Sequence, residues 1–331
     1  MNDIAKHETL LEVSDLDISL HTRHGTFHVV NGISYRIHKG QAMGIVGESG
    51  SGKTIGAYAL LGLLKHPAKI NSGTVVLNGR NLLTLLPNEI SAIRGREISM
   101  VFQNPVGSLD PVYTIGQQII ETIRIYDKSI KYQNAVDQAR QALNAVGIQN
   151  AEVVLGLYPF ELSGGMCQRV IIAISLLGAP KLLIADEPTT ALDVTSQAQI
   201  VSIFKRLKNE RRMSILFISH DFRIVADLCD MVSVMCEGFI LEQGSLEDVL
   251  RHPVHPYTLA LIESIPHLDA PKDKPLPQIG GRPTETIYTI IGCVFASRCS
   301  QTLPICTQQM PPSIMVDEEH SARCWRLHGY S

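Results

Sequence analysis

Gly47-Glu48-Ser49-Gly50-Ser51-Gly52-Lys53-Thr54 is the stretch of this 331-residue chain that decides its fold. It has the form G-x-x-x-x-G-K-S/T, with a run of small apolar residues, Ala42–Val46, before it and a helix-like segment, Ile55–Leu64, after it. Glycines let the backbone curl so that successive N–H groups point inward, and the N-terminus of the following helix adds positive potential. This order of strand, loop and helix predicts a phosphate-binding loop in an α/β fold.

The loop offers both backbone and side-chain contacts to a nucleotide. We expect Lys53 to reach the β- and γ-phosphates and the hydroxyl of Thr54 to bind Mg²⁺. The predicted nucleotide-binding residues of the loop are Gly47, Ser49, Gly50, Ser51, Gly52, Lys53 and Thr54. A glycine–serine turn that matches the pattern by chance is the alternative, and it does not account for the flanking strand and helix.

A second signal for phosphate chemistry is the apolar run Leu182–Ala185, which ends in Asp186 and Glu187. This run and Ile215–Ile218 are apolar at every position, which is typical of parallel strands covered on both faces. Open α/β sheets bind ligands at the carboxyl ends of their strands. We therefore expect Asp186 to hold Mg²⁺ through water and Glu187 to polarise the attacking water. Carboxylates often cap helices, so only the combination with the phosphate loop makes this pair informative.

Periodicity along the rest of the chain also favours an α/β fold with a parallel sheet. The predicted strands near the N-terminus are Leu10–Leu20, Tyr35–Ile37 and Thr74–Leu77. Residues 86–180 are expected to be mostly helical, and the predicted helices of the chain are Ile115–Ile125, Ala135–Val146, Ser196–Asn209 and Ile224–Leu228.

Composition excludes several classes of protein. Hydrophobic residues make up 45% and charged residues 18% of the chain, which is globular rather than disordered composition. The net charge of −3 gives no sign of a broad nucleic-acid-binding face. No apolar run approaches the roughly 18–20 residues of a membrane span, and the N-terminus is acidic where a signal peptide is basic. We expect a soluble, cytosolic chain that reaches a membrane only through a partner.

Four further motifs follow one another along the chain. They are Gln103 within Val101–Pro105, the run Leu-Ser-Gly-Gly-Met-Cys-Gln-Arg at 162–169, Ala191–Asp193, and His220 within Phe217–Asp221. With the phosphate loop and the Asp-Glu strand, this order resembles the Q-loop, signature, D-loop and switch histidine of ATP-binding cassette (ABC) ATPases. The resemblance covers about residues 10–265. It implies a P-loop cassette with a parallel-sheet core, an antiparallel β subdomain and a helical subdomain at about residues 104–178.

The resemblance also implies roles for individual residues. Glu187, His220 and Gln103 are the expected catalytic residues, and Gln103 joins Thr54 and Asp186 around Mg²⁺. Phe27 is placed like the aromatic residue that stacks on adenine. The remaining expected nucleotide contacts are Ser163, Gly164, Gly165 and Asp193, which meet the nucleotide held by a second cassette in a head-to-tail dimer.

Some of these residues can also be interpreted without the family resemblance. Ser163 begins a predicted helix that runs to Leu177, so its hydroxyl and the N–H groups of the two glycines lie at a positive helix end. A histidine at the end of a strand is more often packed or exposed to solvent, and an aromatic residue in a strand usually belongs to the core. Cys167 is the one departure within the signature, and we expect little effect because the preceding Leu-Ser-Gly-Gly is intact.

The resemblance narrows to one subfamily. Phe102–Pro111 is similar to the Q-loop region of dipeptide/oligopeptide and nickel importer ATPases, and His255–Leu261 resembles the helix that follows the cassette in that group. It implies an ATP-hydrolysing subunit that powers import of di- and oligopeptides at the cytoplasmic face of the inner membrane. Its expected partners are a homologous second ATPase subunit, two transmembrane permeases and an extracytoplasmic substrate-binding protein, with no nucleic acid.

Two alternatives remain for the function. The same ATPase role could serve the uptake of nickel, glutathione or antimicrobial peptides. A soluble ABC ATPase that acts on DNA or ribosomes is disfavoured, because the segment between Lys53 and Ser163 has no sustained heptads and the chain has only one signature.

The C-terminal region differs in composition from the cassette. Prolines and glycines after Ile265 predict a linker, so we divide the chain into a cassette (1–265) and a Pro-rich linker with a four-cysteine extension (266–331). The spacing Cys293-x5-Cys299-x6-Cys306-x17-Cys324 lacks the two-residue knuckles usual for structural zinc, although four thiolates suit zinc or a cubane cluster equally by ligand type. The subfamily resemblance implies a 4Fe–4S cluster, with zinc or free thiols as alternatives. The N-terminal histidines His21, His24 and His28 are expected on the surface of a hairpin.

Overall fold

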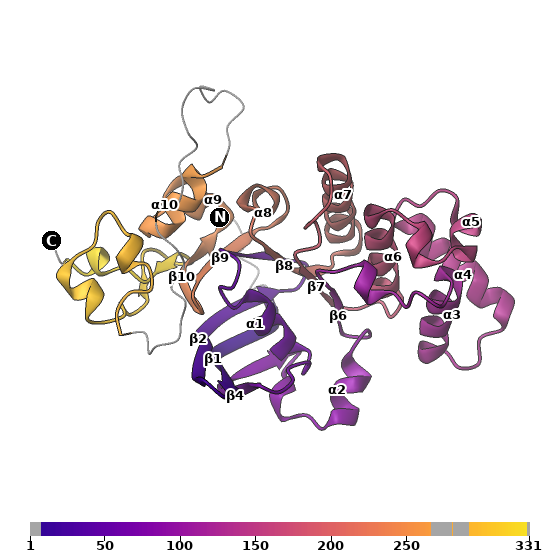
Figure 1. Ribbon diagram of the computed structural model, residues 1–331, viewed down its shortest axis with the longest axis horizontal. Coiled ribbons are helices and arrows are strands. Elements are labelled where there is room, and N and C mark those ends of the chain that lie inside the picture. The colour runs from indigo at the N-terminus through magenta and orange to yellow at the C-terminus, as the bar shows by residue number, and fades with distance from the viewer. Residues whose placement is uncertain (1–7, 266–279, 281–290, 330–331) are drawn as a thin grey trace. The chain divides into compact units, whose positions relative to one another are not determined.

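The computed structural model describes residues 8–265, 280 and 291–329 of the chain (Figure 1). The chain divides into two units. The first contains Met1–Leu85 and Phe217–Ser331, and the second contains Leu86–Leu216. Within the described residues, no helix combines the length and hydrophobicity that a membrane span needs.

The first unit opens with a four-stranded antiparallel sheet. Its strands, in the order β2-β1-β4-β5, are β1 (Thr9–Thr22), β2 (Gly25–His38), β4 (Ala68–Leu77) and β5 (Arg80–Asn81). β1 buries Leu11, Val13, Leu16 and Ile18, as expected for a strand with one face toward the core. The alternation is interrupted between Val13 and Leu16, where the pairing with β2 shifts register. This sheet confirms the antiparallel β subdomain, and the hairpin between β1 and β2 exposes His21, His24 and His28 as expected.

The second sheet region of the first unit contains the strand that leads into the phosphate loop. Its strands are β3 (Ala42–Val46), β9 (Met231–Cys236), β10 (Phe239–Ser245), β11 (Ile314–Met315) and β12 (Ser321–Ala322). β3 is buried at every position and pairs in parallel with β9, as its apolar sequence predicts. The helices of this unit are α1 (Lys53–Leu60), α8 (Phe222–Leu228), α9 (Leu246–Arg251) and α10 (Pro256–Glu263), and β8 (Ser214–Ser219) carries the chain into it from the second unit.

The second unit combines a pair of parallel strands with a group of helices (Figure 1). Its elements are α2 (Pro87–Ile93), β6 (Ile98–Val101), α3 (Ile115–Tyr126), α4 (Tyr132–Ala145), α5 (Ala151–Gly156), α6 (Gly164–Leu176), β7 (Leu182–Asp186) and α7 (Val194–Arg211). Thr114 caps α3 by accepting a hydrogen bond from the Gln117 N–H, and the isoleucines on one face of that helix are buried. The predicted helices are confirmed. The strand β6 was missed because its four buried residues lie in a region expected to be mostly helical.

The described part of the extension, residues 291–329, joins the sheet of the first unit. β12 pairs with β10, so that Ala322 lies opposite Glu242. The buried Glu242 carboxylate lies 2.8 Å from His320 Nε2 and also accepts hydrogen bonds from the N–H groups of Val254 and His255. These bonds tie the extension to the cassette strand. The predicted linker begins at Pro266 and, apart from Gly280, lies outside the described residues.

Candidate nucleotide site

The phosphate loop connects β3 directly to α1, and glycine is required in it for two separate reasons. Gly50 and Gly52 have φ angles of +81° and +96°, in the region that side chains rarely adopt. A Cβ atom at Gly52 would lie 2.2 Å from the carbonyl oxygen of Val29, and one at Gly47 would lie 2.0 Å from that of Met235. The loop therefore packs against the backbones of β2 and β9, and only glycine permits this approach.

Lys53 is buried and its ammonium is held within the loop. Its Nζ donates hydrogen bonds to the carbonyl oxygens of Gly47 (2.8 Å) and Glu48 (2.7 Å) and to Ser51 Oγ (3.2 Å). The Gly238 N–H donates to the Ser51 carbonyl, which fixes the loop to the turn between β9 and β10. α1 has no acidic residue in its first turn, so the positive potential of the lysine and the helix end is not offset there. This arrangement suits an anion such as a nucleotide phosphate.

The other predicted residues of the first unit lie at different depths. Thr54 is half-buried in the first turn of α1, and Ser49 is exposed in the loop. Phe27 lies in β2 opposite Leu20 and is half-buried. His220 follows β8 and is exposed. Their contacts with a nucleotide stay predictions.

Two predicted catalytic residues of the second unit are brought together. β6 and β7 run in parallel with Val101 opposite Ala185, so the residues that follow both strands meet at the same edge. Gln103 Nε2 donates a hydrogen bond to Glu187 Oε2 at 3.0 Å. The hydroxyl of Thr190 donates to the same oxygen at 2.9 Å. These bonds fix one oxygen of the Glu187 carboxylate, which follows the buried Asp186.

The signature and the D-loop also lie side by side. Ser163 is the N-cap of α6 and accepts a hydrogen bond from the Met166 N–H. A Cβ atom at Gly165 would lie 3.0 Å from Ser196 Oγ, at the start of α7. Asp193 caps α7 by accepting bonds from the backbone N–H and the hydroxyl of Ser196, and these bonds lower the pKa of Asp193. Ser163 and Gly164 are exposed, and their contact with a second cassette stays a prediction.

The four cysteines of the extension line one small cavity of about 20 Å³. Burial raises the pKa of the Cys293 thiol to about 11, and the nearby thiols of Cys306, Cys324 and Cys299 act in the same direction. Metal binding at such a site would therefore release protons. Among the described residues, no group of three or more His, Cys, Asp or Glu side chains is placed to hold a metal ion. Four thiols suit a metal or cluster by ligand type alone, and its presence stays a prediction.

Three residues beside the loop were missed by sequence reasoning. Glu48 occupies a variable position of the loop pattern, Tyr257 falls in a predicted helix, and no recognised motif contains Arg298. The structure joins them: the Glu48 N–H donates to the Tyr257 hydroxyl at 3.1 Å, and Arg298 Nη1 donates to Glu48 Oε2 at 2.7 Å. The only available signal was an arginine placed between two cysteines in an apolar stretch, Gly292–Cys299.

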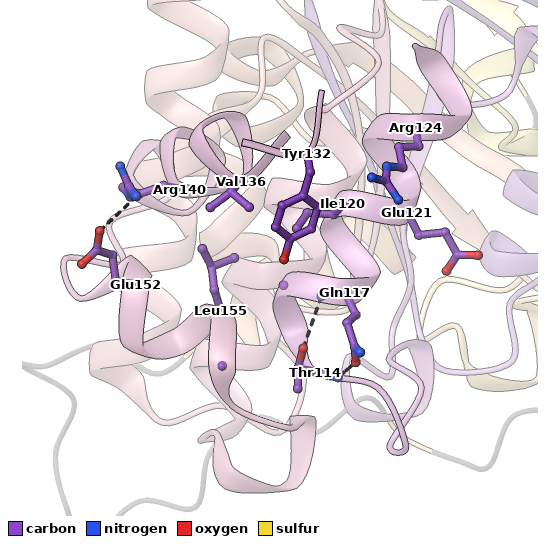
Figure 2. A pocket seen from close by; sticks show the side chains of 12 residues that line it. Thr114, Gln117, Ile120, Glu121, Arg124, Tyr132, Val136, Arg140, Glu152 and Leu155 are labelled. Carbon is purple, nitrogen blue, oxygen red and sulfur yellow. Dashed lines mark hydrogen bonds and ion pairs between the residues drawn. The ribbon is translucent and has the colours of Figure 1, made fainter. Parts of the chain in front are cut away.

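A separate hollow of about 560 Å³ lies within the helical part of the second unit (Figure 2). It is formed by α3, α4 and α5, and Tyr132, Ile120 and Leu155 contribute to its lining. At its rim, Arg140 forms an ion pair of 3.0 Å with Glu152. Next to it lies an apolar patch, which we define as Val112, Tyr113, Tyr158 and Phe160; their exposed fractions are 69%, 51%, 38% and 72%. The bond from the Ile115 N–H to the Leu157 carbonyl holds the two segments of the patch together.

Comparison with known proteins agrees with this geometry. The family model described as ABC transporter matches residues 30–190. A second model, described as the C-terminal region of oligopeptide/dipeptide transporters, matches residues 241–306.

Related proteins and solved structures extend the agreement. The chain is 41% identical over 98% of its length to the probable peptide ABC transporter ATP-binding protein y4tR of Sinorhizobium fredii, of which it covers 97%. It is 42% identical over 92% of its length to the oligopeptide transport ATP-binding protein OppD of Escherichia coli, covering 89% of that protein. The dimeric, ADP- and Pi-bound ATP-binding cassette MJ0796 superposes with a TM-score of 0.65 at 23% identity, covering 72% of this chain and 99% of that one. That likeness shows the ABC cassette fold.

The two loop glycines allow a matched test of the packing. Gly52→Ala should lower the free energy of unfolding by more than Gly50→Ala, because both residues have positive φ angles but only Gly52 approaches another backbone. We expect a cost of about 1 kcal/mol for Gly50→Ala from the left-handed conformation, and more than about 3 kcal/mol for Gly52→Ala. Denaturant unfolding of both variants measures the difference. Equal losses would contradict the close approach to Val29.

Proposed function

Because the chain belongs to the ATP-binding proteins of ABC transporters, in the oligopeptide/dipeptide branch, we propose that it powers the import of di- and oligopeptides through membrane permeases. The chain is an ABC-type ATPase. The observation that carries the proposal is the phosphate loop folded around Lys53, in a chain that also matches the transporter C-terminal region. The protein is expected to associate peripherally with the membrane that holds its permeases, at the cytoplasmic face.

We assign the hydrolytic roles as follows. Lys53 and the loop N–H groups bind the β- and γ-phosphates, and Phe27 stacks on the adenine. Thr54, Gln103 and Asp186 hold Mg²⁺, which when bound neutralises charge on the phosphate oxygens. Glu187 polarises the attacking water; its Oε2 is engaged by Gln103 and Thr190, so the bonds fix the orientation of the carboxylate. His220 contacts the γ-phosphate and holds the same water.

A second, homologous ATPase subunit completes the site in this proposal. Ser163, Gly164 and Gly165 present a hydroxyl and backbone N–H groups at the N-terminus of α6, and these groups close over the γ-phosphate held by the partner. Asp193 holds the start of α7 beside them. ATP binding then closes the dimer, and hydrolysis reopens it.

We propose the apolar patch and the adjoining hollow as the surface that receives a permease. Four large apolar side chains exposed together are typical of an interaction site. The rings of Tyr158 and Phe160 stack at a centroid distance of 5.5 Å, so they form a continuous apolar surface beside the hollow. A groove between helices with an apolar floor suits an amphipathic helix of a membrane partner.

The extension is proposed to hold a 4Fe–4S cluster, with zinc as the alternative. Cys293, Cys299, Cys306 and Cys324 line the same cavity, and four thiolates are the usual ligands of such a cluster. A segment with this small an apolar core gains stability from a bound metal centre. We retain the division into a cassette (1–265), with its helical subdomain at about 104–178, and a linker with the extension (266–331).

Glu187→Gln tests the hydrolytic mechanism in the complete transporter. The amide cannot polarise water, so kcat should fall by at least about a hundredfold while MgATP is retained in a closed dimer. Lys53→Ala should instead abolish nucleotide binding. Peptide uptake, ATP turnover and retained nucleotide are the measurements, and Glu247→Gln on the exposed surface of α9 is the matched control. Uptake at the wild-type rate by Glu187→Gln would rule out this mechanism.

Replacing Tyr158 and Phe160 together by serine tests the permease surface. Loss of the apolar area should reduce co-purification of the permeases by at least about tenfold, since burying two such rings contributes several kcal/mol. MgATP binding by the variant checks that it is folded. Leu86→Ser, at a residue that is 62% exposed outside the patch, is the control. Undiminished co-purification of the double variant would exclude the patch as the contact.

Anaerobic isolation of the complex tests the cysteine site. The wild-type chain should contain about four iron and four sulfide per chain. Cys306→Ser should lose them, whereas Cys229→Ser, a buried free cysteine of the cassette, should keep them. Stoichiometric zinc without iron would show that the site holds zinc and not a cluster. Absence of both metals would show that the four cysteines are free thiols.

A further inference from the structure

Arg298 is a charged residue in an almost fully buried place. Only 2% of its side chain is exposed, and its guanidinium carbon lies 5.9 Å from the centroid of the Tyr257 ring and 5.2 Å from that of the Phe295 ring. Its Nη1 donates to Glu48 Oε2 at 2.7 Å. Glu48 follows Gly47 in the phosphate loop, so an arginine of the extension contacts the loop directly.

Glu48 is held at both its side chain and its backbone. The carboxylate pairs with Arg298, and the backbone N–H donates to the Tyr257 hydroxyl. The carbonyl oxygen of the same residue accepts from Lys53 Nζ at 2.7 Å. A shift of Glu48 therefore changes the position of an oxygen that holds the phosphate-binding lysine.

The carboxylate of Glu48 compensates the positive charge of Arg298. Its Nη2 has the Cys236 sulfur at 3.5 Å, a weak acceptor, and its Nε has no hydrogen-bond acceptor within the described part of the chain. A buried guanidinium is stabilised only when a carboxylate compensates it, and removal of one partner leaves a costly unpaired charge. The Glu48 side chain is 27% exposed and that of Arg298 only 2%, so breaking the pair would leave the arginine without its compensating charge.

Backbone hydrogen bonds among the cysteine-bearing segments hold the turn that carries Arg298. It ends a single 3₁₀ turn, Ala296–Arg298, which has Cys293 before it and Cys299 directly after it. The Cys293 N–H donates to the Cys306 carbonyl at 2.7 Å, and the Ala296 N–H donates to the Cys293 carbonyl at 2.9 Å. Cys293, Cys299 and Cys306 all line the cavity of the extension. Rearrangement of these thiols would move the turn that carries the guanidinium.

We propose that Arg298 is a positioning residue of the phosphate loop, and that through it the state of the four cysteines sets the affinity of the loop for MgATP. The second part rests on the proposed metal centre; the first rests only on the geometry of Arg298, Glu48 and Tyr257. In this arrangement the extension is a control element of the ATPase. Loss of the metal centre weakens nucleotide binding without a change in the residues that perform hydrolysis.

The test measures Kd for MgATP, and KM and kcat for ATP hydrolysis, in the complete transporter. Arg298→Met should raise Kd and KM about tenfold and change kcat by less than about twofold, since a hydrogen-bonded charge is lost beside the binding loop. Arg298→Lys should recover part of the affinity. The double variant Arg298→Met/Glu48→Gln should bind no more weakly than Arg298→Met, because both substitutions break the same connection. Arg251→Met, in an exposed ion pair of α9, is the control.

Removal of the metal with a chelator, which is itself removed before MgATP is added, tests the second part. Kd should rise in the wild type and stay unchanged in Arg298→Met, in which the connection is already broken. If Arg298→Met does not fold, Arg298→Lys and Glu48→Gln provide the same comparison. Unchanged Kd and KM in folded variants, or additive effects in the double variant, would overturn the proposal. Failure of peptide import alone would refute the proposed function and leave this result intact, because nucleotide binding is measured without peptide.

Discussion

The close contact of the phosphate loop with its neighbouring backbones is the constraint on which the rest of the structure depends. The loop carbonyls hold the buried ammonium of Lys53, and this is possible only where the chain curls through glycine at positive φ. The loop is also fixed from outside, by Val29 of β2 and by the bond from Gly238 to Ser51. The antiparallel sheet and the β9–β10 hairpin therefore fix the conformation of the loop.

The proposed hydrolytic residues of the second unit, Gln103 and Glu187, are brought together by the register of two parallel strands. Glu187 and Gln103 are far apart in sequence, yet Val101 lies opposite Ala185, and this places the residues after each strand at one edge. The backbone of Glu187 has a φ of +45°, in the left-handed region, as the chain turns sharply out of β7. The bonds from Gln103 and Thr190 then orient its carboxylate.

The sequence allowed prediction of everything that a local pattern encodes. β3 was predicted with its observed bounds because five apolar residues precede a glycine loop, and α6 because Ser163 is followed by a continuous apolar face. β6 was missed, since four buried residues are too few to distinguish a strand from a helix by periodicity. The resemblance implied that Gln103 and Glu187 are both catalytic residues, but the bond between them was not predicted. The contact of Arg298 with Glu48 joins residues separated by most of the chain, and no spacing rule encodes such a pair.

The extension packs into the unit that carries the phosphate loop. It adds β12 to the edge of β10, and the buried His320–Glu242 pair anchors it there, while Glu242 also fixes the start of α10. α10 in turn carries Tyr257, whose hydroxyl accepts from the phosphate loop. Two routes thus lead from the extension to the loop: one through the sheet and α10, the other through Arg298. Both routes end at Glu48, where Arg298 contacts the side chain and Tyr257 the backbone N–H.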